Sequence, residues 1–192
     1  MAEQVARGSV RSPHDRRVAR GRSRALVALA AALVLAAPAI PIFHPRVDGP
    51  SRTDAVVVLG PSTDRRVRLG EDLVRRGQAS ALVVSAHPAD LGGERPAVCD
   101  DRHVRYPVFC FDPVPATTQG EARAVRELAR RHGWSSVRVV TFGPQLSRAR
   151  LLVSRCYDGD VRMTDSGDSY DAAYMYLYQT GAFVKALGLP GC

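Results

Sequence analysis

The sequence lacks the glycine-rich motifs that usually mark a nucleotide site. Neither the G-x-G-x-x-G pattern of dinucleotide-binding folds nor the G-x-x-x-x-G-K-[ST] phosphate loop occurs. The G-x-S-x-G motif of serine hydrolases and the C-x-x-C pairs typical of zinc sites are absent as well. The sequence therefore offers no familiar motif for these nucleotide, hydrolase or zinc classes.

Net positive charge is small outside the first 24 residues. The 192-residue chain has a formal net charge of +8, of which residues 1–24 contribute +5 through seven arginines and two acidic residues. The rest of the chain carries only +3. A mildly basic globular part gives little support for nucleic-acid binding, so we expect no nucleic-acid partner.

Charged residues are absent from residues 25–43. This run is close to the roughly 20 residues that cross a bilayer as a helix, and the arginines before it predict a cytoplasmic N-terminus. We expect a basic cytoplasmic tail over 1–24, a transmembrane anchor over 25–43, a short linker over 44–53 and an extracytoplasmic domain over 54–192. The alternative is a cleaved signal peptide and a secreted domain, because Ala37-Pro38-Ala39 resembles a cleavage site.

The four cysteines all follow the apolar segment: Cys99, Cys110, Cys156 and Cys192. An even number of cysteines in an exported domain predicts disulfides, and three pairings are possible. We favour Cys99–Cys110, which closes a short loop, and Cys156–Cys192, which would fix the C-terminus to the domain. A zinc site formed by the first two cysteines with His87 and His103 is a weaker alternative, because the spacing is irregular.

Short apolar runs alternate with helical patterns along the domain. Strands are predicted over 54–60, 81–85, 107–111 and 137–141, with a fifth near 161–163. Helices are predicted over 64–76, 118–132, 146–156 and 170–187. Continuous β-branched runs are typical of strands buried on both faces. We therefore expect an α/β, Rossmann-like, doubly wound fold with a mostly parallel sheet of about five strands.

Ligands of such sheets bind outside the carboxyl ends of the strands. Arg148, near the start of the helix after the fourth strand, is the first candidate, because a guanidinium group and a helix N-terminus both favour an anion. Arg68 lies about one turn into the first helix, where it could point back toward the same site. Gly60 permits close approach of the backbone to a ligand. The other candidate ligand-binding residues are Ser62, Ser85, Thr118, Thr141 and Gln145.

The segment Thr118-Gln119-Gly120-Glu121 fits a capping box. In that motif the Thr118 hydroxyl and the Glu121 carboxylate each accept a hydrogen bond from an amide at the helix start. Glu121 is also the candidate general base if the chain is an enzyme.

Several short motifs follow one another in a fixed order: Asp54 to Gly60, Arg68, Leu82 to Ser85, Thr118, Glu121-Ala122, Val140-Thr141 and Arg148-Ala149. This order resembles the YdcF/SanA/ElyC family of bacterial envelope proteins over about residues 54–155. The resemblance implies a Rossmann-like fold, often with an N-terminal anchor, and a role in cell-envelope integrity. It strengthens the candidacy of Gly60, Arg68, Glu121 and Arg148. One branch of the family suggests S-adenosylmethionine or a nucleotide as a ligand, although both are scarce outside the cytoplasm.

Three positions depart from the pattern of that family. Pro61 stands where a second glycine is usual, and Ser85 is followed by Ala86-His87 instead of two glycines. Gln145 stands three residues before Arg148 in place of a histidine. Glutamine can donate and accept hydrogen bonds but cannot replace a histidine in acid–base or metal chemistry, so the departures favour binding over catalysis.

We therefore expect a membrane-anchored extracytoplasmic protein that binds an anionic envelope metabolite or glycan precursor at the strand ends, with no metal. Two other functions stay open. One is a hydrolase or transferase that acts on an envelope substrate through Glu121. The other is an interaction protein with a vestigial pocket, whose partner surface is the C-terminal helix. Tyr170, Tyr174 and Tyr178 recur there every four residues, a pattern more typical of packing with hydroxyls at the rim.

Overall fold

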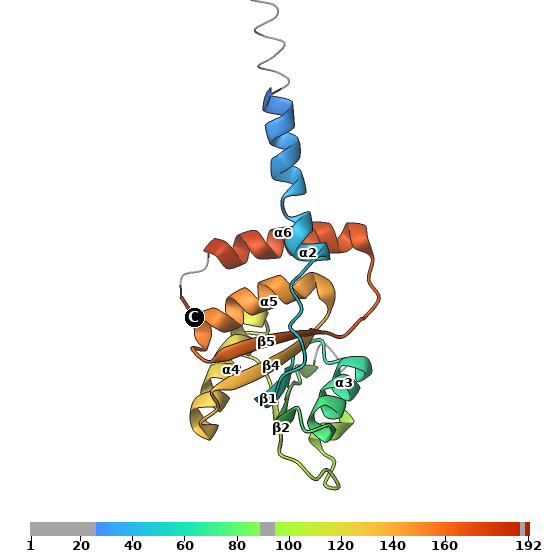
Figure 1. The fold of residues 1–192 in the computed structure, drawn as a ribbon, viewed down its shortest axis with the longest axis vertical. Coiled ribbons are helices and arrows are strands. Elements are labelled where there is room, and N and C mark those ends of the chain that lie inside the picture. The colour runs from blue at the N-terminus through green and yellow to red at the C-terminus, as the bar shows by residue number, and fades with distance from the viewer. Residues whose placement is uncertain (1–25, 89–94, 189–190) are drawn as a thin grey trace, which may run out of the picture. The chain divides into compact units, whose positions relative to one another are not determined.

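The computed structural model describes residues 26–88, 95–188 and 191–192. The chain forms two compact units, residues 1–38 and Ala39–Cys192. The described part of the first unit is an apolar helix over residues 26–36 with exposed side chains. The apolar helical segment Leu26–Phe43 is long and apolar enough to cross a membrane, and a signal sequence would have the same character. The second unit is an α/β domain (Figure 1).

Five parallel strands form one sheet in the order β3-β2-β1-β4-β5, which confirms the predicted fold class. The strands are β1 (Thr53–Val58), β2 (Ala79–Ser85), β3 (Val108–Phe111), β4 (Ser136–Thr141) and β5 (Asp160–Asp165). The first strand ends at Val58 and not at Gly60 as predicted. The strand order reverses between β1 and β4, so the carboxyl ends of these two strands form the topological switch point of the sheet.

Helices cover both faces of the sheet (Figure 1). They are α2 (Ala39–Phe43), α3 (Asp64–Arg75), the short 3₁₀ helix η2 (Ala97–Cys99), α4 (Thr118–His132), α5 (Gly143–Cys156) and α6 (Ala172–Gly188). Because successive residues of a strand point to opposite faces, Val56 and Val58 pack with α3, whereas Val57 and Leu59 pack with α4 and α5. α6 lies against α5, on the side away from the sheet (Figure 1).

The helix α2, which we expected to be the last part of an anchor, is packed on the domain. Ile42 is fully buried, and the ring of Phe43 stacks on Tyr170 and Tyr176 with centroid distances of 6.5 and 6.4 Å. The Ser147 hydroxyl of α5 donates to the Pro41 carbonyl at 2.7 Å. The expected anchor over 25–43 therefore shares its last five residues with the α/β domain.

The expected linker over 44–53 lies against the domain. The Asp48 N–H donates to the Met163 carbonyl at 3.0 Å, and the Asp48 carboxylate accepts from the Met163 N–H at 2.7 Å. The buried guanidinium of Arg138 donates to the carbonyls of Gly49 and Ser51. The segment is therefore held along β5 by its backbone and by a buried arginine.

Two disulfides join distant parts of the domain and confirm the favoured pairing. Cys99–Cys110 connects η2 with β3, and Cys156–Cys192 connects the end of α5 with the C-terminus. Because Cys99 and Cys110 are bonded to each other, the alternative zinc site is wrong. In the part of the chain that the structure describes, no group of three or more His, Cys, Asp or Glu side chains is placed to hold a metal ion.

Candidate functional site

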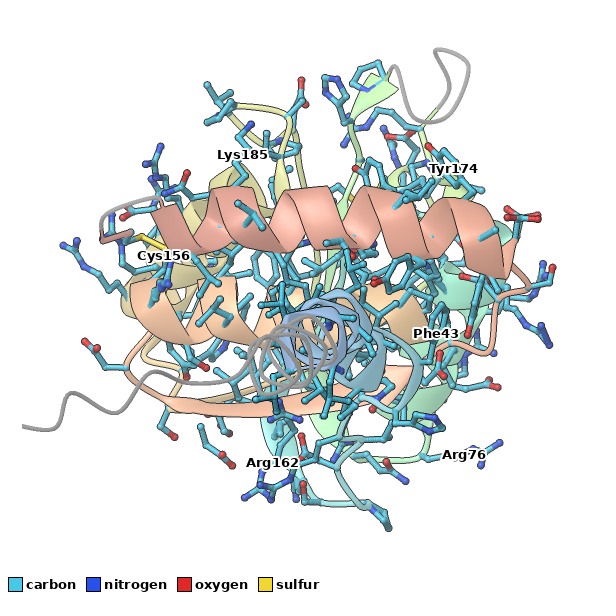
Figure 2. The ribbon with its side chains drawn as sticks, turned by 90° about the horizontal axis from the view of Figure 1, so that it is seen from above. Phe43, Arg76, Cys156, Arg162, Tyr174 and Lys185 are labelled. Atoms are coloured by element: carbon cyan, nitrogen blue, oxygen red, sulfur yellow. A yellow bond between two sulfur atoms is a disulfide. The ribbon has the colours of Figure 1, made fainter. Side chains whose placement is uncertain are left out.

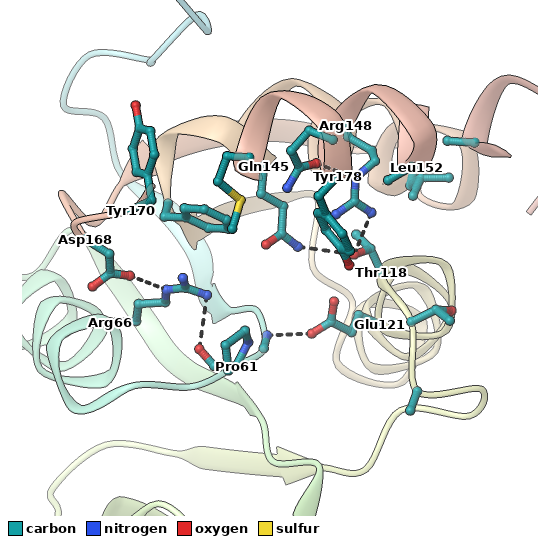
Figure 3. Close-up of a pocket in the computed structure, with 18 of the residues that line it drawn as sticks. Pro61, Arg66, Thr118, Glu121, Gln145, Arg148, Leu152, Asp168, Tyr170 and Tyr178 are labelled. Atoms are coloured by element: carbon teal, nitrogen blue, oxygen red, sulfur yellow. Dashed lines mark hydrogen bonds and ion pairs between the residues drawn. The ribbon is translucent and has the colours of Figure 1, made fainter. Parts of the chain in front are cut away.

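A cavity of about 990 Å³ opens at the carboxyl ends of β1 and β4 (Figure 3). Its lining comes from the turn after β1, the first turns of α4 and α5, the loop after β5 and one side of α6. The cavity therefore lies at the topological switch point, where open parallel sheets bind their ligands. Its volume lies within the range of small-molecule sites.

Arg148, the first candidate from the sequence, is buried at the back of this cavity (Figure 3). Its Nε donates to Gln179 Oε1 at 2.9 Å, and its Nη1 donates to Thr118 Oγ1 at 3.1 Å. Burial lowers the pKa of the Arg148 guanidinium from its usual value, yet arginine remains charged at neutral pH. Among the described residues it forms no salt bridge, and its two hydrogen-bond partners are neutral. The Glu121 carboxylate acts on it only electrostatically.

Thr118 connects this arginine to a neighbouring glutamine. Its Oγ1 accepts from Arg148 Nη1 at 3.1 Å and from Gln145 Nε2 at 3.2 Å. A hydroxyl has two acceptor positions and one donor hydrogen. Since both acceptor positions are used, the Thr118 hydroxyl can act toward a ligand only as a donor.

The orientation of the Gln145 amide follows from its two partners. Gln145 Oε1 accepts from the Thr141 hydroxyl at 3.1 Å, so its Nε2 group is the one directed at Thr118. Both side chains are buried, and Thr141 stands behind Gln145 outside the cavity lining. Gln145 therefore positions Thr118, and its amide has no basic group with which to abstract a proton.

Glu121 also lines the cavity, but its carboxylate is hydrogen-bonded to the turn after β1, on the opposite wall. Its Oε1 accepts a 2.6 Å hydrogen bond from the Gly60 N–H (Figure 3). The capping-box prediction was wrong, because Thr117 is the N-cap residue and its hydroxyl accepts from the Gly120 N–H. The Glu121 carboxylate instead reaches across to the turn after β1.

Arg66 occupies the position that we expected for Arg68. It is buried, its Nε donates to Asp168 at 2.5 Å, and its Nη1 donates to the Pro61 carbonyl at 3.0 Å. Its guanidinium also lies 4.8 Å from the ring centroid of Phe142. Arg68 has a side chain that is 69% exposed, pairs with Asp64 at 3.7 Å and does not line the cavity. The two arginines differ because α3 directs Arg66 inward and Arg68 outward.

Ser62 and Ser85, two further candidates, are buried beside the cavity and do not line it. The Ser62 hydroxyl donates to the Ser85 carbonyl, which ties the turn after β1 to the end of β2. The structure therefore brings Gly60, Thr118, Glu121, Gln145 and Arg148 together at the cavity, while Ser62, Ser85 and Thr141 lie behind it and Arg68 lies outside it.

One side of α6 forms the remaining wall, which sequence reasoning did not assign to the site. Gln179 is fully buried, and its Nε2 group has no hydrogen-bond partner among the described residues. Tyr174 and Tyr178 are 59% and 52% exposed, with their rings stacked at 5.9 Å. The packing expected for the three tyrosines holds for Tyr170, which lies against Phe43 and Phe142, and is wrong for Tyr174 and Tyr178, which line the cavity with largely exposed side chains.

Three hydrogen-bond donors thus converge on the back of the cavity: the Arg148 guanidinium, the Thr118 hydroxyl and the Gln179 amide. The two acidic residues of the lining are engaged elsewhere, Glu121 with Gly60 and Asp168 with Arg66. This arrangement suits an anionic group and offers no pair of free carboxylates for acid–base work.

A comparison with known protein families finds no family model that matches this chain, and a search of curated proteins finds no significant match.

Proposed function

We propose that the α/β domain binds an anionic envelope metabolite or glycan precursor in the cavity at the ends of β1 and β4. The observation that carries this proposal is the buried guanidinium of Arg148, which faces the cavity and pairs with no acidic residue among those described. Burying a charge is costly unless it is paired, so a bound anion would supply the salt-bridge partner that Arg148 lacks.

The neighbouring groups support an anion over a neutral ligand. The Thr118 hydroxyl is left as a donor, and the fully buried Gln179 amide has an unused donor group. The first turns of α4 and α5 also line the cavity, and backbone N–H groups at such positions favour negative charge. A phosphate or carboxylate could accept from all of these donors at once.

The rim indicates the rest of the ligand. Tyr174, Tyr178 and Met175 form an apolar and aromatic edge, and Lys185 adds a further cation to the lining. A cavity of about 990 Å³ holds more than a simple ion. We therefore favour a ligand with an anionic head and a ring-containing body, such as a sugar phosphate. A nucleotide or S-adenosylmethionine is chemically compatible but has only the family resemblance in its favour.

The same proposal places the domain outside the cytoplasm, with the N-terminus inside. Two disulfides favour an oxidising compartment, and the apolar helix over residues 26–36 follows a strongly basic segment. The motif order that resembles the YdcF/SanA/ElyC family supports an envelope role. A hydrolase or transferase is less favoured, because the candidate base Glu121 already accepts from the Gly60 N–H.

Thermal unfolding of the full chain in mild detergent, with its disulfides intact, tests this proposal. The panel is inorganic phosphate, sugar phosphates, uridine-linked peptidoglycan precursors, nucleotides and S-adenosylmethionine. We expect at least one sugar-linked anion to stabilise the domain by about 2.7 kcal/mol at 100 times its dissociation constant. A panel in which no anion changes the unfolding temperature would contradict the proposal.

A further inference from the structure

The outward side of α6 is an apolar stripe that faces away from both the cavity and the protein core. We define the α6 stripe by its six residues, which follow one another at helical spacing: Ala173, Leu177, Thr180, Gly181, Val184 and Gly188. Leu177 is 72% exposed and Val184 is 67% exposed, and the neighbouring Leu187 is exposed as well. A surface helix of a protein in water normally places charged and polar residues on this side.

The α6 stripe contains no charged residue, and its one polar side chain is turned inward. The Thr180 hydroxyl donates to the Tyr176 carbonyl at 2.6 Å, so its hydrogen is already used within the helix. Lys185, the only charged residue between Ala172 and Gly188, lies on the cavity side with Tyr174 (Figure 2). An uncharged apolar strip of this kind marks a surface that is covered in use.

The chain itself indicates what covers the stripe. Only Ala37 and Pro38 separate the apolar helix over 26–36 from α2, so α2 begins within about 11 Å of the end of that helix. A helix over 26–36 is about 16 Å long, and the hydrocarbon core of a bilayer is about 30 Å thick. If this helix is an anchor, the short link keeps the start of α2 close to the bilayer.

α2 is in direct contact with α6, which brings the stripe to the same level. Phe43 stacks on Tyr170, which precedes the start of α6, and on Tyr176, which lies within α6. On α2 itself, Ile40 is 67% exposed and extends the apolar surface. Four of the six tyrosines of the chain lie between residues 170 and 178, and tyrosine is enriched where membrane meets water.

We infer that the α6 stripe lies on the outer surface of the lipid bilayer, with its leucine and valine side chains among the acyl chains and the tyrosines at the headgroups. The inference rests on the membrane anchoring in the proposed function. The ligand is not required for it. A bilayer fits the stripe better than a protein partner does, because the covalent link to the apolar helix keeps α2, which contacts α6, close to the bilayer.

The test uses full-length protein in phosphatidylglycerol–phosphatidylethanolamine vesicles, with or without lipids brominated on the acyl chains near the headgroup. Bromine quenches only tryptophans that reach the acyl chains. Trp134 is the only tryptophan of the wild-type chain and provides the background. The informative variant is Leu177→Trp, with Val184→Trp as a second probe if the first lowers the unfolding temperature.

The matched control is Arg76→Trp, at the exposed end of α3 on the other face of the sheet. We expect brominated lipid to remove most of the added emission of Leu177→Trp and to leave that of Arg76→Trp at its value in plain lipid. Equal quenching of the two variants would overturn the inference. So would a Leu177→Trp signal that bromine leaves unchanged while chemical crosslinking captures a dimer, because a second copy would then cover the stripe.

Failure of the anchor gives a different result. If the wild-type protein is recovered without vesicles and its N-terminus follows Ala39, the segment before α2 was a signal peptide. The inference that the α6 stripe lies on the bilayer then fails as well. The ligand-induced rise in unfolding temperature would persist in that case. The two proposals can therefore fail separately.

Discussion

The Oε1 atom of Glu121 accepts a 2.6 Å hydrogen bond from the backbone N–H of Gly60, across 61 positions of sequence. This bond joins the first turn of α4 to the turn after β1, so it fixes two walls of the cavity relative to each other. The side chain that looked most like a general base is therefore part of the framework that shapes the site.

Substitutions at Glu121 separate these two roles. Glu121→Gln keeps an oxygen that can accept from Gly60, so we expect its ligand affinity to stay within a few-fold of the wild type. Glu121→Ala leaves the Gly60 N–H without this partner and should lower the free energy of unfolding by about 1–3 kcal/mol. Urea unfolding and ligand titration check both. If a turnover assay is found, a general-base role requires that Glu121→Gln abolish turnover while binding is kept.

Gly120 lies where α4 passes the loop that precedes it. A Cβ atom at this position would overlap the carbonyl oxygen of Pro115, which belongs to the cavity lining. We expect Gly120→Ala to cost about 1–3 kcal/mol of stability through this overlap. Gly181→Ala is the matched control, because a Cβ there has open space and removes the helical cost of glycine. Equal urea midpoints for the two variants would contradict the packing described.

The two disulfides should differ in their contribution to stability. Cys156–Cys192 closes a separation of 36 residues and Cys99–Cys110 one of 11. A chain-entropy account gives about 4 kcal/mol for the longer loop and about 3 kcal/mol for the shorter one. Double serine variants of each pair, compared by urea unfolding, measure the difference. Loss of Cys156–Cys192 should also weaken the ligand effect, since it frees the end of the chain that follows α6.

Asp54 should make stability depend on acidity. Burial raises the pKa of its carboxyl, but hydrogen bonds from the backbone and hydroxyl groups of Ser135 and Ser136 outweigh burial and lower the pKa below its ordinary value of 3.8. The ionised form therefore stabilises the fold above about pH 3.8, and this contribution is lost as the pH falls through the lowered folded-state value.

The measurement for Asp54 is urea unfolding of the wild type and Asp54→Asn at several pH values. We expect the variant to be less stable at pH 7 and the difference to shrink as the solution is acidified below pH 3.8. Asp158→Asn, at an exposed position, is the control and should differ little from the wild type throughout. A difference for Asp54→Asn that grows on acidification would have the wrong sign.

The sheet was predictable from the sequence because its signal is local. Continuous β-branched runs such as Val56 to Val58 are buried on both faces, and their alternation with helical patterns leaves few possible architectures. The first residues of the helices were harder to predict from the sequence. α5 begins at Gly143 and not at Leu146, because Pro144 occupies the first turn, where no backbone donor is needed.

The site was predictable only where strand ends determine it. Arg148, Gly60 and Glu121 follow from the rule that ligands bind at the carboxyl edge of a parallel sheet. The choice between Arg66 and Arg68 depended on Asp168, which lies 102 positions away and draws Arg66 inward. Gln179 and the tyrosine rim come from α6, whose place over the cavity depends on tertiary packing that no local pattern reveals.

The most direct test of the account compares two arginines of one domain. Arg148→Gln and Arg68→Gln each remove one positive charge, yet only Arg148 lines the cavity. Titration of both variants with the best sugar-linked anion of the panel, by calorimetry, gives their dissociation constants. We predict a loss of affinity of at least tenfold for Arg148→Gln, as expected for a lost charge-assisted hydrogen bond, and little change for Arg68→Gln. Equal affinities for Arg148→Gln and the wild type would contradict the central claim.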